Sequence, residues 1–134
     1  MKVQQFVHTL HYGDAISSEA LTIRNVLREL GMESTIYSVN THPKLQDEAR
    51  HFSQFAQDRQ GGEAVAVILH YSIASPLNEL FTGLENAYKA VVYHNVTPEK
   101  WFLAYNARVV ADLRAARAGL EQTIGWYLDH EAWW

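Results

Sequence analysis

The 134-residue sequence contains no cysteine, which excludes disulfides, thiolate metal ligands and thiol nucleophiles. It has no low-complexity segment, and no stretch is apolar for long enough to span a membrane as a helix. The opening residues, MKVQQFVHTLHYG, contain one lysine and only a short, interrupted apolar run, so we expect no signal peptide. These absences lead us to expect a cytoplasmic protein.

Positive charge is also scarce in this sequence. It has 11 Lys and Arg residues against 15 Asp and Glu residues, which gives a formal net charge of -4. Because the arginines are scattered or confined to one late segment, no basic stripe could release counterions from a nucleic acid, and we exclude nucleic acid as a partner. The chain does have 48% hydrophobic residues, which is ordinary for a globular protein that buries its own core.

Apolar segments of two kinds alternate along the chain. Short β-branched or continuously apolar runs predict strands at residues 3–7, 34–39, 64–70 and 89–94. Apolar residues at three- and four-residue steps predict helices over about residues 18–30, 44–60, 76–84 and 98–128. Seven apolar residues are expected on the buried side of the last helix: Trp101, Phe102, Tyr105, Val109, Leu113, Ala116 and Leu120.

This alternation of strands and helices predicts an α/β fold. We expect one Rossmann-like domain of three layers over residues 1–134, in which a parallel sheet carries helices on both faces. The predicted strand order is 2-1-3-4. The third and fourth strands are continuously apolar and need covered positions, whereas the alternating strand at 34–39 suits an edge.

Three of the predicted strands end in a histidine: His8, His70 and His94. In such a sheet ligands bind beyond the carboxyl ends of the strands, near the point where the winding reverses, so we expect a site at this edge. Each histidine taken alone is more often a hydrogen-bonded structural residue than a catalyst. Zinc is an alternative, with Asp14 as a further ligand, but no closely spaced histidine pair occurs and we expect no metal.

The HYGDA turn at residues 11–15 is a second clue. Gly13 would let the backbone approach a ligand closely, and the amides at the start of the following helix would suit a phosphate. The alternative is a plain strand-to-helix turn in which Asp14 hydrogen-bonds to the backbone. A single glycine is not a dinucleotide fingerprint, so we expect no such cofactor.

The ending WYLDHEAWW, residues 126–134, is unusually rich in tryptophan. It could pack back on the domain, contact a partner or touch a membrane interface, and the sequence leaves these alternatives open. Nucleophilic catalysis by Ser72 or Ser75 is not expected, because no G-x-S-x-G elbow surrounds either residue.

Three segments occur in one order: HTLHYGDAISSEALTIRNVLRELGMESTIYS, then VILHYSIASPLNEL, then KAVVYHNVTPEKWF. Together they resemble the acceptor-side, N-terminal domain of retaining glycosyltransferases with the two-domain GT-B fold, the large family-four group. The resemblance covers about residues 3–120. It implies an enzyme that uses a nucleotide-sugar donor and a hydroxyl acceptor, and that needs no metal for transfer.

The resemblance also implies roles for particular residues. In that family the glycine-containing loop after the first strand lies near the donor diphosphate, and a strand-end histidine lies beside the reacting sugar. The matching residues here are Gly13 and Asp14 for the diphosphate and His94 for the sugar, where it would position the ligand and support the transition state electrostatically. The acceptor side would be lined by His70 and Tyr71, with polar contacts from Asn95 and Thr97.

Enzymes of this family also need a C-terminal domain that carries most of the donor site, and that domain is absent from these 134 residues. We therefore expect the chain to be inactive or nearly so by itself, as half of a truncated or split enzyme. A separate donor-domain chain would then be its partner, and a homo-oligomer formed through the C-terminal tail is also open. The alternative is a non-catalytic binding module that uses the strand-end rim or the tryptophan-rich tail.

Overall fold

The computed structural model describes residues 2–59, 63–95 and 98–129, which divide into two compact units. The first unit comprises the described residues of Met1–Tyr71 and Pro76–His94, and the second those of Ser72–Ser75 and Asn95–Trp134. The expectation that residues 1–134 form a single domain stays a prediction.

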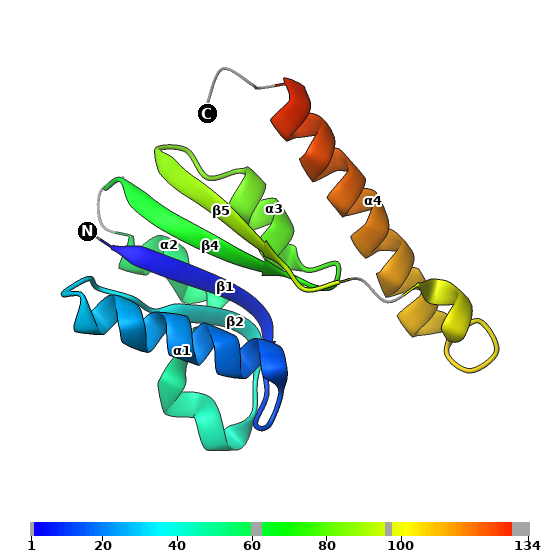
Figure 1. The fold of residues 1–134 in the computed structure, drawn as a ribbon, viewed down its shortest axis with the longest axis horizontal. Helices are drawn as coiled ribbons and strands as arrows, with labels where there is room; N and C mark the ends of the chain where they lie inside the picture. The colour runs from blue at the N-terminus through cyan, green and yellow to red at the C-terminus, as the bar shows by residue number, and fades with distance from the viewer. Residues whose placement is uncertain (1, 60–62, 96–97, 130–134) are drawn as a thin grey trace. The chain divides into compact units, whose positions relative to one another are not determined.

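The first unit is an α/β structure built on one parallel sheet of five strands (Figure 1). Its strands are β1 (Val3–Leu10), β2 (Ile36–Thr41), β3 (Ala49–His51), β4 (Val65–Tyr71) and β5 (Ala87–Tyr93). Its helices are α1 (Ala15–Glu29), α2 (Phe55–Asp58) and α3 (Pro76–Thr82), with the 3-10 helices η1 (Pro43–Glu48) and η2 (Phe52–Gln54). The predicted Rossmann-like α/β class with a parallel sheet is therefore confirmed.

The strand order is β3-β2-β1-β4-β5. The four predicted strands keep their predicted relative order, but the stated order 2-1-3-4 lacks β3, which lies at the edge outside β2. One positional expectation was wrong as a result, because the strand at 34–39 corresponds to β2, which is interior rather than an edge. The fourth predicted strand corresponds to β5, which lies at the end of the sheet as the predicted order has it.

The helix predicted over residues 44–60 is replaced by η1, β3, η2 and the four-residue helix α2. The histidines at 42 and 51 explain the breaks, because each accepts a hydrogen bond from a backbone amide two residues on. Such local side-chain caps end one element and begin the next. Apolar spacing alone does not reveal these caps, and for that reason it predicts a single helix here.

The two faces of the sheet are covered by different helices, with α1 on one face and α2 and α3 on the other (Figure 1). In the pairing of β1 with β2, Gln5 aligns with Ile36 and Phe6 with Tyr37. Because successive side chains alternate between faces, these two pairs mark opposite sides. On the α1 side the core contains Val7, Leu10, Ala20 and Ile36, all at most 1% exposed.

The opposite face is held by an aromatic cluster. The rings of Phe6, Tyr37 and Phe55 meet edge to face, with centroids 5.0 to 6.2 Å apart. The hydroxyl of Tyr37 donates a 2.9 Å hydrogen bond to Asp58, which also pairs with Arg50 at 2.8 Å. These contacts fix α2 against the sheet and hold β3 at its edge, although both elements are too short to be stable alone.

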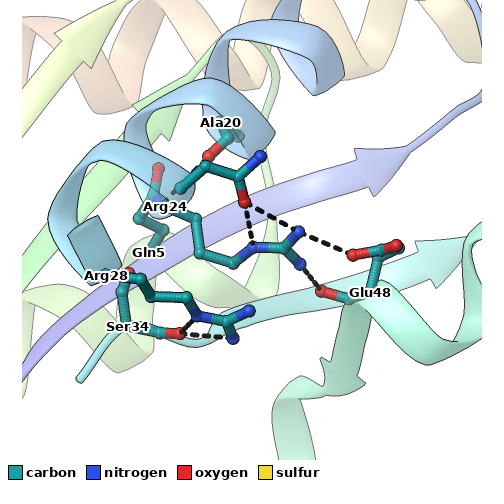
Figure 2. A network of polar contacts seen from close by, with 7 residues as sticks. Gln5, Ala20, Arg24, Arg28, Ser34 and Glu48 are labelled. Carbon is teal, nitrogen blue, oxygen red and sulfur yellow. Dashed lines mark hydrogen bonds and ion pairs between the residues drawn. The ribbon is translucent and has the colours of Figure 1, made fainter.

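A buried arginine joins α1 to the end of η1 (Figure 2). Arg24 is 6% exposed, and its guanidinium donates to the backbone carbonyl of Glu48 at 2.8 Å and pairs with the Glu48 carboxylate at 2.6 Å. One turn later, Arg28 donates two hydrogen bonds to the carbonyl of Ser34 at the start of the β2 segment. The fork of donors on each arginine therefore ties α1 to the chain on both sides of β2.

The second unit contains the 3-10 helix η4 (Glu99–Trp101) and the long helix α4 (Ala107–Asp129). The predicted helix from Pro98 to about Leu128 thus begins at Ala107 instead, after a turn. Asn106 makes the new start, because its side chain accepts from the amide of Val109 at 3.1 Å. No helix among the described residues is both long and apolar enough to cross a membrane.

Two of the aromatic residues expected on the buried side of that helix are exposed. Trp101 is 66% exposed and Tyr105 is 86% exposed, and both lie before α4 rather than in it. Leu113 and Ala116 of the predicted stripe are buried in α4, together with Val110, which was not predicted. The helical spacing of Trp101 and Tyr105 was therefore misleading, because η4 and the following turn separate them from the helix.

Candidate functional site

Two of the predicted site histidines meet at the carboxyl edge of the sheet. His70 is the penultimate residue of β4, and His94 follows β5 directly. In the pairing of these strands His70 aligns with Val92, so alternation puts His94 on the same face as His70. Their rings are nearly parallel, at 13°, with centroids 5.1 Å apart, and His70 Nδ1 lies 2.8 Å from His94 Nε2.

Gln5 fixes the proton positions in this pair. The side-chain amide of Gln5 donates to the carbonyl of Ala20 in α1 at 3.1 Å, so its oxygen Oε1 is left to face His70 Nε2 at 2.9 Å. That oxygen can only accept, and His70 Nε2 therefore carries the ring proton. The other nitrogen of neutral His70 is then an acceptor, and His94 Nε2 must donate to it.

Burial keeps His70 in this neutral form. Its residue is 2% exposed, and burial, followed by the nearby His94, lowers the pKa of His70 from 6.5 to about 4. A charged imidazole there would lose most of its hydration with only neutral partners in reach. Near neutral pH His70 is thus a fixed hydrogen-bond relay rather than a proton donor or acceptor.

The free nitrogen of His94 points to a carboxylate. His94 Nδ1 lies 3.5 Å from Glu19 Oε2 on α1, and the Glu19 side chain is 49% exposed whereas that of His94 is 11% exposed. Because Nε2 of His94 already donates to His70, a neutral His94 has its lone pair on Nδ1. A proton on Nδ1 instead makes the imidazolium, which donates to Glu19. The hydrogen bonds of the site therefore run in one direction, from His94 to His70 and from His70 to Gln5. The exposed Glu19 carboxylate lies beyond His94 Nδ1.

His8 does not join the other two histidines. β1 continues to Leu10, so His8 lies within the strand and not at its end as expected. Val7 aligns with His70, which places the neighbouring His8 side chain on the opposite face of the sheet. The expected gathering of three imidazoles is reduced to a pair.

The turn predicted to approach a phosphate has the geometry of a helix cap. Gly13 has φ +80, which favours glycine, and Asp14 is the N-cap of α1. The Asp14 carboxylate accepts from the amide of Ser17 at 3.0 Å and from its hydroxyl at 2.9 Å. This is the arrangement that the plain-turn alternative describes, and a diphosphate role for Gly13 and Asp14 stays a prediction.

Tyr71, Asn95 and Thr97 are the remaining predicted site residues. Tyr71 aligns with Tyr93, is 2% exposed and points to the face opposite His70, although its carbonyl accepts from the His94 amide at 2.9 Å. Asn95 has an exposed side chain and a left-handed backbone with φ 48. Thr97 lies outside the described residues. Contacts of Tyr71, Asn95 and Thr97 with a substrate stay predictions.

Sequence reasoning missed Gln5 and Glu19. Gln5 did carry a signal, since an amide in the middle of the apolar VQQFV run must find buried partners, and it is 0% exposed. Glu19 carried none, because an acidic residue on an exposed turn of an amphipathic helix is ordinary. Only the packing of α1 over the sheet brings this carboxylate to His94.

Among the described residues, no group of three or more histidine, aspartate or glutamate side chains is arranged to hold a metal ion. Comparison of the chain with protein-family models, with curated proteins and with solved structures found no significant match in any of the three. Fold and site geometry together define an α/β Rossmann-like protein with a histidine pair at the carboxyl edge of its sheet.

Proposed function

We propose that this chain forms the acceptor-binding side of a nucleotide-sugar-dependent glycosyltransferase. The catalytic unit would be completed by a donor-binding domain, supplied by another chain or by a further segment of a longer protein. The proposal takes its reaction type from the resemblance of the strand-end segments to GT-B enzymes. Its support from the structure is the location and polarity of the His70–His94 pair.

The observation that carries the proposal is the 3.5 Å contact between His94 Nδ1 and Glu19 Oε2 at the carboxyl edge of the sheet. When His94 is neutral and Glu19 is ionised, the Nδ1 lone pair and the carboxylate oxygen lie 3.5 Å apart, and neither can donate to the other. A ligand with neighbouring hydroxyl groups supplies the missing donors. Sugars are the commonest ligands of this kind, and the edge beyond the strand ends is where parallel α/β sheets bind ligands.

His94 would act by orientation and electrostatics rather than by covalent chemistry. Glycosyl transfer passes through an oxocarbenium-like transition state while a negative diphosphate departs. An imidazole whose orientation is set by His70 and Gln5 would accept from a sugar hydroxyl without having to reorganise, as transition-state stabilisation requires. His70 supports that orientation through its hydrogen bond to His94 and, because it is buried, does not reach the ligand.

The loop at Gly13 has a narrower role in this proposal than the resemblance implies. The carboxylate of Asp14 is negative and accepts two hydrogen bonds from Ser17, so it would repel a diphosphate rather than bind one. Contact with the donor would come from backbone amides around Gly13. Asp14 would then contribute by holding the loop on α1.

The test is transfer in a completed assembly. The chain is first used as bait in its native extract to identify a co-purifying Rossmann-like chain with a donor site, and the purified pair is assayed with radiolabelled nucleotide sugars. We expect His94→Ala to lower kcat/KM at least tenfold while its midpoint of urea unfolding changes little. A loss of a hydrogen bond to the transition state is typically of this size or larger.

The matched control is His51→Ala, which removes an exposed histidine on the edge strand β3, four strands away from β5 in the sheet. It should leave transfer unchanged. Full activity of the His94→Ala pair would contradict the role of His94. Recovery of partners without any donor site would instead favour the non-catalytic binding module.

A further inference from the structure

The geometry points to a second binding surface at the same edge of the sheet, one that takes a phosphorylated sugar ring. We call it the ring shelf, and it consists of His11, Tyr12, His42 and Lys44. It deepens the proposed function by naming the class of acceptor, and it rests on that function for its role in transfer. Binding itself can be measured independently of transfer.

The shelf gathers three rings and one ammonium group where β1 and β2 end. The rings of His11 and His42 lie with centroids 4.9 Å apart, and those of Tyr12 and His42 with centroids 6.3 Å apart. The Lys44 ammonium lies over the Tyr12 ring, 4.8 Å from its centroid. Tyr12 is 61% exposed, so much of its surface is available to a ligand.

The shelf is anchored to the core through its backbone. The amide of His11 donates to the hydroxyl of buried Ser17 at 2.8 Å, and the amide of His42 donates to the carbonyl of Leu10 at 2.8 Å. On the other side, Leu45 packs against the core. The Arg24–Glu48 pair holds the far end of η1, on which Lys44 lies (Figure 2). A surface fixed at both ends loses little entropy when a ligand binds.

Hydrogen bonds also determine which ring nitrogens of His42 and His11 carry a proton. His42 Nδ1 accepts from the amide of Lys44 at 3.2 Å, so a neutral His42 carries its proton on Nε2. His11 Nδ1 lies 2.9 Å from the carbonyl of Tyr12 and therefore carries a proton, which leaves Nε2 as an acceptor. The shelf thus offers one N–H donor and one acceptor in addition to the ammonium group.

The charge of the shelf is positive and unpaired. Among the described residues Lys44 makes no ion pair, and its one side-chain contact is the Tyr12 ring. The carboxylate of Asp14, two residues after Tyr12 in the same loop, accepts hydrogen bonds from Ser17. An ammonium group and an imidazole N–H together suit a phosphate, whereas an exposed tyrosine ring suits the apolar face of a sugar ring. A phosphorylated sugar satisfies both demands at once.

The experiment measures binding to the whole chain by NMR and calorimetry, with glucose 6-phosphate, glucose and inorganic phosphate as probes. We expect saturable binding of glucose 6-phosphate that perturbs Tyr12 and His42, with both partial probes at least tenfold weaker. Lys44→Gln should weaken glucose 6-phosphate binding about tenfold, as expected for loss of a charge-assisted hydrogen bond. Tyr12→Ala should weaken it severalfold through lost ring contact.

The control is Lys2→Gln, which removes the same charge directly before β1, at the amino ends of the strands and away from the shelf. This variant should bind as the wild type does. Equal affinity of Lys44→Gln and wild type would overturn the inference, as would equal affinity for inorganic phosphate and glucose 6-phosphate. Stronger binding of adenosine monophosphate than of glucose 6-phosphate would also overturn it, in favour of a nucleotide.

A phosphorylated ring can be a soluble sugar phosphate or the headgroup of a lipid. Sedimentation with phosphatidylcholine vesicles, with and without phosphatidylinositol, separates these sources, because Lys44-dependent sedimentation requires the headgroup. Failure of the shelf and failure of the proposed function remain distinguishable. Binding that depends on Lys44 without transfer in any assembly would refute the function alone, whereas transfer that depends on His94 without such binding would refute the shelf alone.

Discussion

At the scale of single residues, the site depends on a buried amide that determines the state of two histidines. Gln5 can offer only its oxygen to His70 because its nitrogen is used by Ala20. That one constraint passes through His70 to His94 and leaves Nδ1 of His94 as the nitrogen that faces Glu19. The proton position on His94 at the carboxyl edge of the sheet is therefore set by Gln5, which is two hydrogen bonds away from it.

The depressed pKa of His70 predicts a particular dependence of stability on pH. Its folded pKa of about 4 lies below its ordinary value of 6.5, so the unfolded chain takes up this proton first as the pH falls. The stability that depends on a neutral His70 is fully present above about pH 6.5 and is lost as the pH falls from there to about 4. The free energy of unfolding falls by about 1.4 kcal/mol per pH unit in this window, or about 3 kcal/mol in total. Urea unfolding at a series of pH values measures it.

The groups that face His70 in this window are His94 Nε2 and Gln5 Oε1, with Glu19 one step beyond. The His70→Gln variant tests the contribution, because it removes the His70 ring and keeps every other titratable residue in the chain. Its stability should fall less steeply below pH 6.5 than that of the wild type. Parallel curves for the two proteins, or an NMR titration of the His70 ring near its ordinary pKa, would show that His70 is not kept neutral by burial.

At the scale of elements, short pieces are held by specific side chains rather than by their own stability. η1, β3, η2 and α2 each span six residues or fewer. None of them would form alone, since an isolated helix of this length does not repay its nucleation cost. Arg24, Tyr37 and Asp58 supply the long-range contacts that fix them.

Arg24 provides the prediction at this scale. Arg24→Met keeps an apolar stem but leaves the Glu48 carbonyl without its donor, and we expect a loss of about 1–3 kcal/mol in the free energy of unfolding. Arg24→Lys should recover only part of it, because an ammonium group lacks the planar fork. The control is Arg117→Met, whose exposed pair with Glu121 should matter by less than about 1 kcal/mol. Equal urea midpoints for Arg24→Met and Arg117→Met would contradict this account.

At the scale of the whole molecule, the sheet sets a gradient of stability from its centre to its edges. β1 is hydrogen-bonded to β2 on one side and to β4 on the other, and Phe6 and Val7 within it are at most 1% exposed. β3 has only three residues and one neighbouring strand, and none of its residues is buried. The central strand should therefore open only when the whole sheet unfolds.

Native-state hydrogen exchange followed by NMR tests this gradient. We expect the amides of Phe6 and Val7 to exchange only through global unfolding, with protection equal to the total free energy of unfolding. The amides of Arg50 and His51 in β3 should exchange at least a hundredfold faster through local opening. Equal protection in β1 and β3 would mean that the sheet opens as one unit and that its edge is not a weak point.

The α/β class and the relative order of four strands were predictable because they depend on local patterns. A continuously apolar run such as AVAVILH indicates a strand buried on both faces, and the helical spacing after Ser17 indicates a helix buried on one face. Both patterns depend only on residues that are close together in the sequence. The helix expected over residues 44–60 failed for the converse reason. His42 and His51 interrupt it through caps that do not alter the apolar spacing.

By itself the sequence determined that strands and helices alternate, and that His70 and His94 end two of those strands. Only the tertiary structure decided what these histidines meet. Gln5 and His70 are 65 positions apart, and Glu19 reaches His94 only because α1 packs over the strand ends. His8, which the same local pattern marked, falls on the other face because β1 runs to Leu10. Periodicity fixes which residues are buried, but register and packing decide which of them touch, since those depend on strands far apart in the chain.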